Sequence, residues 1–243
     1  MRYLLTINYI GTAYHGWQVQ ENAVAVQPVV QDAIEKIIGF RPHLSGCSRT
    51  DSGVHAKMYC CHFDSAKELD PLKLVGGLNH FLPSDIGALN CNIVADDFHA
   101  RYSCKAKEYV YIIENSKGRD AFFEKRALHY PHKLDEKLLN RAAQEFIGTH
   151  DFSSFCSVGA KEGDKTRTVM ISEITRHGDK VIFRVCADGF LYNMVRIMVG
   201  TLLRVAENRI STEEIPVIIE SKNRKYAGPT APAHGLYLNK VYY

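Results

Sequence analysis

Residues 27–63 read QPVVQDAIEKIIGFRPHLSGCSRTDSGVHAKMYCCHF, an apolar helical pattern followed by a polar loop and an apolar strand pattern. Pro28 stands near the first helical position, and Val30, Ala33 and Ile34 begin an apolar stripe. Gly39 follows as a C-cap, so the spacing predicts a helix over residues 27–38. Residues 57–63 then read as a strand.

Helical and strand patterns alternate in the rest of the chain as well. Strands are predicted at 2–9, 86–94, 108–114, 168–176, 180–187 and 236–242, and helices at 70–80, 134–147, 191–207 and after the capping-box spacing of residues 211–214. No long Pro/Gly/Ser linker marks a boundary. We therefore predict an α+β fold of two similar α/β halves, 1–105 and 106–243, which share a largely antiparallel mixed sheet. Helices would cover one face and a cleft would lie on the other.

The composition is that of an ordinary globular protein, with 46% hydrophobic and 23% charged residues in 243. No apolar run approaches the roughly 18 residues of a membrane span, and the N-terminus lacks a signal-peptide pattern, so we expect a cytoplasmic protein without membrane association. The seven cysteines form no CxxC pair. Buried reduced thiols are the expected state, rather than disulfides or a zinc site.

Positive charge is unevenly distributed, although the net charge is only +3. Residues 101–133 carry eight Lys/Arg against four Asp/Glu, and residues 222–240 carry four against none. Such segments can form the cationic stripe that nucleic-acid binding needs. Charge alone is equally compatible with solvated lysines on an ordinary surface.

The densest polar cluster is residues 46–56, GCSRTDSGVHA. Gly46 and Gly53 permit a sharp turn that presents Asp51. Arg49 could pair with Asp51 if the loop curves, which would lower the pKa of the carboxyl and keep it ionised at neutral pH. A turn in which Asp51 caps backbone amides and Arg49 lies on the surface is the alternative.

Two further clusters follow. Tyr109 and Tyr111 share a strand face with Lys107, which suits base stacking beside a phosphate contact, although core tyrosines would give the same pattern. Arg196 stands beside the apolar stripe of the helix predicted over residues 191–207. Such a cation needs a partner or a cleft, and Asp51 is a candidate, unless the arginine extends to water.

Other site types have less support in the sequence. Asp96 and Asp97 could bind magnesium but suit a solvated turn better, and the eleven histidines show no metal-ligand spacing. No GxSxG, P-loop or GxGxxG motif appears, which removes the usual sequence support for a serine hydrolase, an NTPase or a dinucleotide enzyme.

Taken together, these clusters resemble the bacterial tRNA pseudouridine synthase family that modifies positions 38, 39 and 40 of the anticodon arm. The segments that carry the resemblance are 9–18 (YIGTAYHGWQ), 49–56 (RTDSGVHA), 98–101 (FHAR), 107–111 (KEYVY), 151–155 (DFSSF), 189–196 (GFLYNMVR) and 227–232 (AGPTAP). They span nearly the whole chain. Ser48 and Ser52 depart mildly, standing where the family often has glycine and alanine.

The resemblance implies the pseudouridine synthase fold with an RNA-binding cleft. Asp51 would be the nucleophile, Tyr109 would stack on the base, and Arg196 would hold Asp51 ionised. Arg49, Lys107, Arg101 and Tyr109 are expected to contact the RNA. The resemblance further implies tRNA as partner, a homodimer, and neither cofactor nor metal. The remaining alternatives are a non-catalytic RNA-binding protein on the same scaffold and a synthase for another RNA site.

Overall fold

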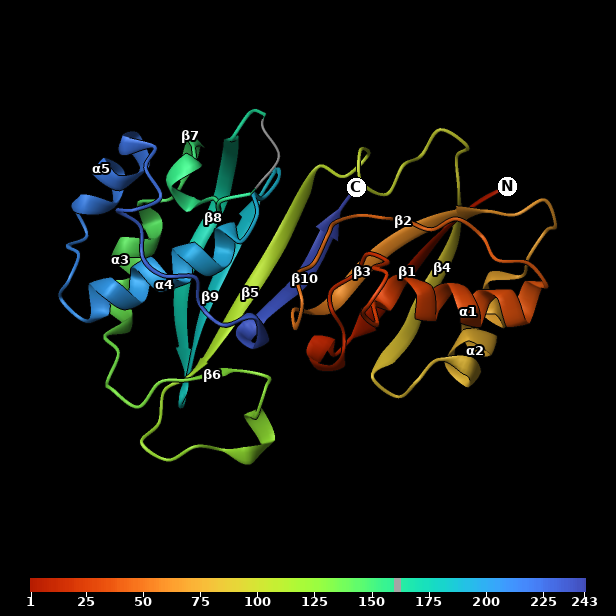
Figure 1. The fold of residues 1–243 in the computed structure, drawn as a ribbon, viewed down its shortest axis with the longest axis horizontal. Coiled ribbons are helices and arrows are strands. Elements are labelled where there is room, and N and C mark those ends of the chain that lie inside the picture. Colours follow the sequence, from red (N-terminus) through yellow and green to blue (C-terminus); the bar gives the residue numbers. More distant parts are fainter. Residues whose placement is uncertain (160–162) are drawn as a thin grey trace. The chain divides into compact units, whose positions relative to one another are not determined.

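The computed structural model describes residues 1–159 and 163–243, which form two compact units (Figure 1). The first unit comprises Met1–Lys105 together with Tyr237–Tyr243, and the second comprises Ala106–Leu236. The sequence pattern places all of residues 106–243 in the second half. The strand that closes the chain instead belongs mainly to the first unit.

The first unit is an open sheet with two helices. Its elements are β1 (Arg2–Tyr9), α1 (Val26–Ile38), β2 (Ser45–Gly46), β3 (His55–Asp64), α2 (Pro71–Phe81), β4 (Ile86–Val94) and β10 (Leu236–Tyr242). The strand order is β4-β1-β3-β10, and β2 pairs with β3. The β1 pairings with β3 and β4 are antiparallel, whereas β10 runs parallel to β3 through Tyr237 opposite His55.

The second unit also combines a sheet with helices, but its strands are connected in a different order. Its elements are β5 (Ala106–Glu114), β6 (Leu128–His129), α3 (Glu136–Gln144), β7 (Gly148–Asp151), β8 (Thr166–His177), β9 (Lys180–Ala187), α4 (Met194–Ala206) and α5 (Glu214–Ser221). The order β5-β9-β8-β7 is antiparallel throughout, and the short β6 pairs parallel with β5. Helix α3 packs on β8 and against α4.

Each unit has its own apolar core between helices and sheet. In the first, Tyr3, Leu5 and Ile7 alternate along β1 as the sequence predicts, and all three are fully buried. In the second, Met198 and Leu202 of α4 are buried in the same way. The α+β class with mixed, mostly antiparallel strands is thus confirmed.

Helix ends follow local signals where those signals are strong. The carboxylate of Asp70 accepts hydrogen bonds from the amides of Leu72 and Lys73 at the start of α2, which satisfies amides that have no partner within the helix. Gly39 ends α1 at φ 82°, a left-handed conformation that favours glycine. Within the described ranges, no helix has the length and apolar character needed to cross a membrane. The seven cysteines all lie in the described ranges and form no disulfide, and six of them are buried.

Candidate active site

The loop that carries Asp51 connects β2 to β3 in the first unit. At its start, the amide of Cys47 donates to the carbonyl of Cys60 on β3 at 2.8 Å, and the hydroxyl of Tyr59 donates to the carbonyl of Ser48 at 2.5 Å. Tyr59 itself stacks on Trp17, with ring centroids 4.1 Å apart. The beginning of the loop is therefore held against a buried aromatic pair.

Residues 9–17 hold the centre of the loop from the other side. The hydroxyls of Tyr9 and Thr50 lie 2.8 Å apart in a buried hydrogen bond. The amide of Trp17 donates to the carbonyl of Thr50 at 3.3 Å, and the amide of Gly53 donates to the carbonyl of Tyr14 at 3.1 Å. The residue before Asp51 and the second residue after it are thus both bonded to one segment.

Gly16 permits this close approach. It has φ +84°, and a Cβ built at this position would overlap the carbonyl oxygen of Thr50. No other residue type combines a left-handed backbone with the absence of a side chain. Segment 9–18 is one of the motifs that carry the resemblance to the family. In the structure it supports the loop that holds Asp51.

Asp51 is half-buried at the turn of this loop. Its carbonyl accepts from the amide of Val54 at 3.2 Å, which closes the turn, while Thr50 is buried and Ser52 is exposed. The Arg49 side chain is exposed, and no ion pair joins it to Asp51 or to another carboxylate among residues 1–159 and 163–243. The local Arg49–Asp51 pair considered from the sequence is not formed.

His55, which no sequence pattern marks as a candidate, lies fully buried at the end of the loop. Its Nδ1 accepts from the amide of Gly11 at 2.9 Å, so the proton of the neutral ring lies on Nε2. The ring stacks on Tyr237 of β10 at 4.6 Å. The histidine thereby ties the loop to the residues before Tyr14 and to the last strand. Its position in the resembling segment was the only signal.

In the second unit, Tyr109 lies on β5 and is 6% exposed. Its ring meets the edge of Phe190 at a centroid distance of 5.0 Å and an interplanar angle of 84°. Tyr111 is fully buried, and its hydroxyl donates to the carbonyl of Pro232 at 2.8 Å. Tyr111 is therefore a tyrosine of the core, which is one of the two roles that the sequence pattern allows. Lys107 is half-exposed near the start of the same strand.

Arg196 lies in the first turn of α4, half-buried and held in a fixed orientation. Its Nη1 donates to Oδ1 of Asn193 at 2.7 Å, and its Nε donates to the carbonyl of Ala231 at 2.7 Å. The amide of Ala231 in turn donates to the carbonyl of Arg196 at 3.0 Å. Asn193, at φ 60°, also donates through Nδ2 to Ser157 Oγ at 2.9 Å. A planar guanidinium pinned by two acceptors is preorganised to bind a further anionic group.

Arg101 lies in the first unit on an exposed turn. Its guanidinium stands 5.7 Å from the ring centroid of Tyr102, and its amide donates to Nδ1 of His99 at 3.1 Å. The first unit therefore holds Asp51, Arg49 and Arg101, and the second holds Lys107, Tyr109 and Arg196. In the part of the chain that the structure describes, no group of three His, Cys, Asp or Glu side chains is arranged to hold a metal ion.

The comparisons by sequence with known proteins identify one family. A family model described as tRNA pseudouridine synthase matches residues 5–103 and 142–243. The tRNA pseudouridine synthase A of Clostridium acetobutylicum is 48% identical, and that of Acetivibrio thermocellus is 47% identical. Each alignment covers 98% of this chain and 98% of the relative. One chain of the crystal structure of a Cbf5-Nop10-Gar1 complex is 14% identical at a TM-score of 0.41, over 83% of this chain and 44% of its own.

Proposed function

Because this chain belongs to the tRNA pseudouridine synthase family, we propose that Asp51 is the nucleophile with which it acts on uridine. The enzyme is an isomerase that converts uridine to pseudouridine in tRNA. Its relatives favour this activity over the non-catalytic RNA-binding protein that the sequence left open.

The reaction sets modest chemical demands. The bond from N1 of the uracil to the ribose C1′ breaks, and a bond from C5 to C1′ forms. The proton on C5 is lost, and N1 gains one. No atom is added and no electron is transferred to an external acceptor, so a positioned nucleophile and a means of holding the released base suffice.

The observation that carries the assignment is the way the loop fixes Asp51. Thr50 and Gly53 are bonded to residues 9–17, while Asp51 itself is only half-buried. A carboxylate on a rigid backbone with an open side meets the geometric demand on a nucleophile, because a displacement of about 1 Å can cost a hundredfold in rate. Attack would occur at the ribose C1′ or at C6 of the base.

Tyr109 and Arg196 are proposed to act on the same nucleotide. A base leaves its stack at a cost of a few kcal/mol, and an aromatic ring such as that of Tyr109 can replace part of the lost stacking. Arg196 would supply positive charge that keeps the Asp51 carboxylate ionised and helps hold the flipped nucleotide. Arg49, Arg101 and Lys107 would contact the RNA.

By the resemblance of its motifs, we propose that the substrate uridines are those at positions 38, 39 and 40 of the anticodon arm. We also propose a homodimer that works in the cytoplasm on its tRNA. Mapping pseudouridine in tRNA from cells that lack the protein tests the positions. If the only pseudouridines lost lay outside the anticodon arm, the proposed positions would be contradicted.

Release of tritium from tRNA labelled at C5 of uridine tests the nucleophile. Wild type should release the label, whereas Asp51→Ala should bind the same tRNA and release none. Ser52→Ala is the matched control, because Ser52 is exposed beside Asp51 and alanine is common there in the resembling family. Equal release from wild type and Asp51→Ala would overturn the assignment.

A further inference from the structure

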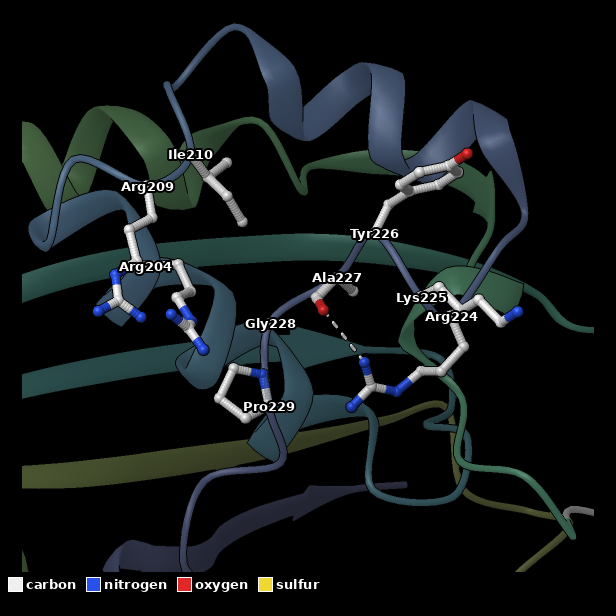
Figure 2. A pocket seen from close by; sticks show the side chains of 9 residues that line it. All are labelled: Arg204, Arg209, Ile210, Arg224, Lys225, Tyr226, Ala227, Gly228 and Pro229. Atoms are coloured by element: carbon white, nitrogen blue, oxygen red, sulfur yellow. Dashed lines mark hydrogen bonds between the residues drawn. The ribbon is translucent and has the colours of Figure 1, made fainter.

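We propose that a basic pocket at the C-terminal end of α4 binds a phosphate group of the tRNA backbone, an inference that rests on the proposed RNA substrate. The pocket has a volume of about 400 Å³ and lies within the second unit (Figure 2). Arg204, Arg209 and Arg224 line it together with the segment Ala227–Pro229. That segment belongs to the motif AGPTAP, whose first residues have no role in the active site described above.

The charges in this pocket do not cancel. Arg204 and Arg209 share one carboxylate, that of Glu207, at 3.6 and 3.4 Å. No carboxylate among the described residues pairs with Arg224. Three guanidinium groups and one carboxylate leave two positive charges for a ligand. Lys225 also contributes to the lining, but its ammonium group points away from the arginines in Figure 2.

Arg224 is built into the wall rather than extended into solvent. Its Nη1 donates to the carbonyl of Ala227 at 3.2 Å, and its Nη2 lies 3.4 Å from Oγ1 of Thr230. Burial lowers the pKa of Arg224 below its ordinary value, because a desolvated cation is disfavoured. An anion in the pocket would offset that cost, and guanidinium groups match the oxygens of a phosphate in geometry.

The floor of the pocket is rigid. The amide of Gly228 donates to Oγ1 of Thr201 at 2.8 Å, and this hydroxyl donates to the carbonyl of Ile197 at 2.9 Å. A Cβ at Gly200 would overlap the carbonyl of Pro229, so helix and segment are in direct backbone contact. A fixed floor means that the backbone beneath the ligand needs little ordering when the ligand binds.

Two features favour an RNA phosphate over a free one. Arg196 and Arg204 are eight residues apart on α4, about 12 Å along the helix axis, a distance that a few nucleotides can span. A strand held at Arg196 could therefore continue to the pocket. Tyr226, which is 62% exposed, adds an aromatic surface beside the cations, as is common where single-stranded RNA is bound.

Equilibrium binding of the full-length protein to tRNA, measured over a series of salt concentrations, tests the proposal. Arg224→Gln and Arg204→Gln should each weaken binding about tenfold at low salt. The plot of log affinity against log salt should become shallower by about 0.7–0.9 for each phosphate that the variant no longer binds. Glu207→Gln should act in the opposite direction and tighten binding.

Lys137→Gln is the matched control, because Lys137 is an exposed cation of the same unit on α3, outside the pocket. It should leave affinity and salt slope unchanged. Melting temperatures identify any variant whose loss of binding reflects unfolding. If Arg224→Gln unfolds, the other two variants still test the proposal, because Arg204→Gln should weaken tRNA binding and Glu207→Gln should tighten it.

A second experiment distinguishes a phosphate group of RNA from a free phosphate ion. Inorganic phosphate is titrated into wild type and Arg224→Gln, with melting temperature as the readout. Stabilisation of wild type alone, together with unaltered tRNA binding by all pocket variants, would mean a small-anion site and overturn the proposal. Unaltered tRNA binding without any phosphate effect would overturn it too. Asp51→Ala should keep the full pocket-dependent binding, so a failure of the nucleophile assignment would be seen separately in label release.

Discussion

The hydroxyls of Tyr9 and Thr50 form a buried 2.8 Å hydrogen bond, and this bond joins the first strand of the sheet to the residue before Asp51. It links the stability of the first unit to the position of the proposed nucleophile. Substitutions in residues 9–17 should therefore affect catalysis through the position of the loop.

The Tyr9–Thr50 bond should appear as a coupling energy between the two side chains. Tyr9→Phe leaves the buried hydroxyl of Thr50 without this partner and should lower the free energy of unfolding by about 1–3 kcal/mol, with a fall in kcat. Thr50→Val should behave similarly. The double variant should lose less than the sum, because both polar groups are then removed. Strictly additive losses in denaturant unfolding would contradict the proposed coupling.

Gly16 and Gly39 offer a matched pair of glycines. Both have positive φ, +84° and +82°, but only at Gly16 would a Cβ overlap another backbone, that of Thr50. Gly39→Ala should cost about 1 kcal/mol of stability and leave activity intact. Gly16→Ala should cost about 3 kcal/mol or more and lower kcat in the fraction that remains folded. Equal stability losses and equal activities for the two variants would show that the contact with Thr50 is unimportant.

Asn193 should act as a positioning residue for Arg196. Its Oδ1 accepts from Arg196 Nη1, and its own backbone is left-handed. Asn193→Gly keeps that backbone accessible but removes the acceptor, so kcat should fall about tenfold to a hundredfold with little change in tRNA affinity. Asn193→Asp retains an acceptor oxygen and should recover most of kcat. A purely structural role would predict a lower melting temperature for the glycine variant and no rescue by aspartate.

His62 should make stability depend on pH. Burial lowers the pKa of His62 to about 4, with further lowering by His99 and Arg2, and its Nδ1 accepts from the amide of Ala100. The unfolded chain binds the proton more readily than the folded one. Stability from this group is therefore complete above about pH 6.5 and is lost as the pH falls toward 4.

His62→Asn provides the measurement, because its amide oxygen can accept the same amide hydrogen but does not titrate. Between pH 7 and pH 4.5 the wild type should lose on the order of 1 kcal/mol more than the variant, after allowance for solvent screening. Denaturant unfolding at both pH values gives this difference. His234, whose pKa burial also lowers, titrates in both proteins, so its contribution cancels. Parallel pH profiles would rule out His62 as the source.

Sequence patterns predicted the elements well where local signals and packing agreed. The strands Arg2–Tyr9 and Lys180–Ala187 have the predicted bounds, and α1 differs only at its first residue. Helix α3 is shorter than predicted, because Leu134 and Phe146 are buried outside its ends and extend the apolar pattern beyond the helix. The apolar periodicity shows which side chains are buried, but not where the hydrogen bonds of the helix begin and end.

The start of α4 shows a second limit. The apolar pattern begins at Leu191, but the helix begins at Met194, because Asn193 adopts φ 60° to bond with Arg196 and Ser157. A side-chain interaction here overrides the local pattern. Sequence likewise marked Asp51, Tyr109 and Arg196 as candidates, but not the buried His55 or the pocket around Arg224. These depend on contacts between segments far apart in the chain.

The backbone contact between Gly200 and Pro229 makes the protein unequally tolerant of changes in chain length. Residues 228–231 run beside α4. They are hydrogen-bonded to Thr201 at one end and to Arg196 at the other, so the length of the segment is fixed. An inserted residue there would put one of the two attachments out of register. Linkers or labels meant to leave the enzyme working should therefore be placed outside residues 228–231.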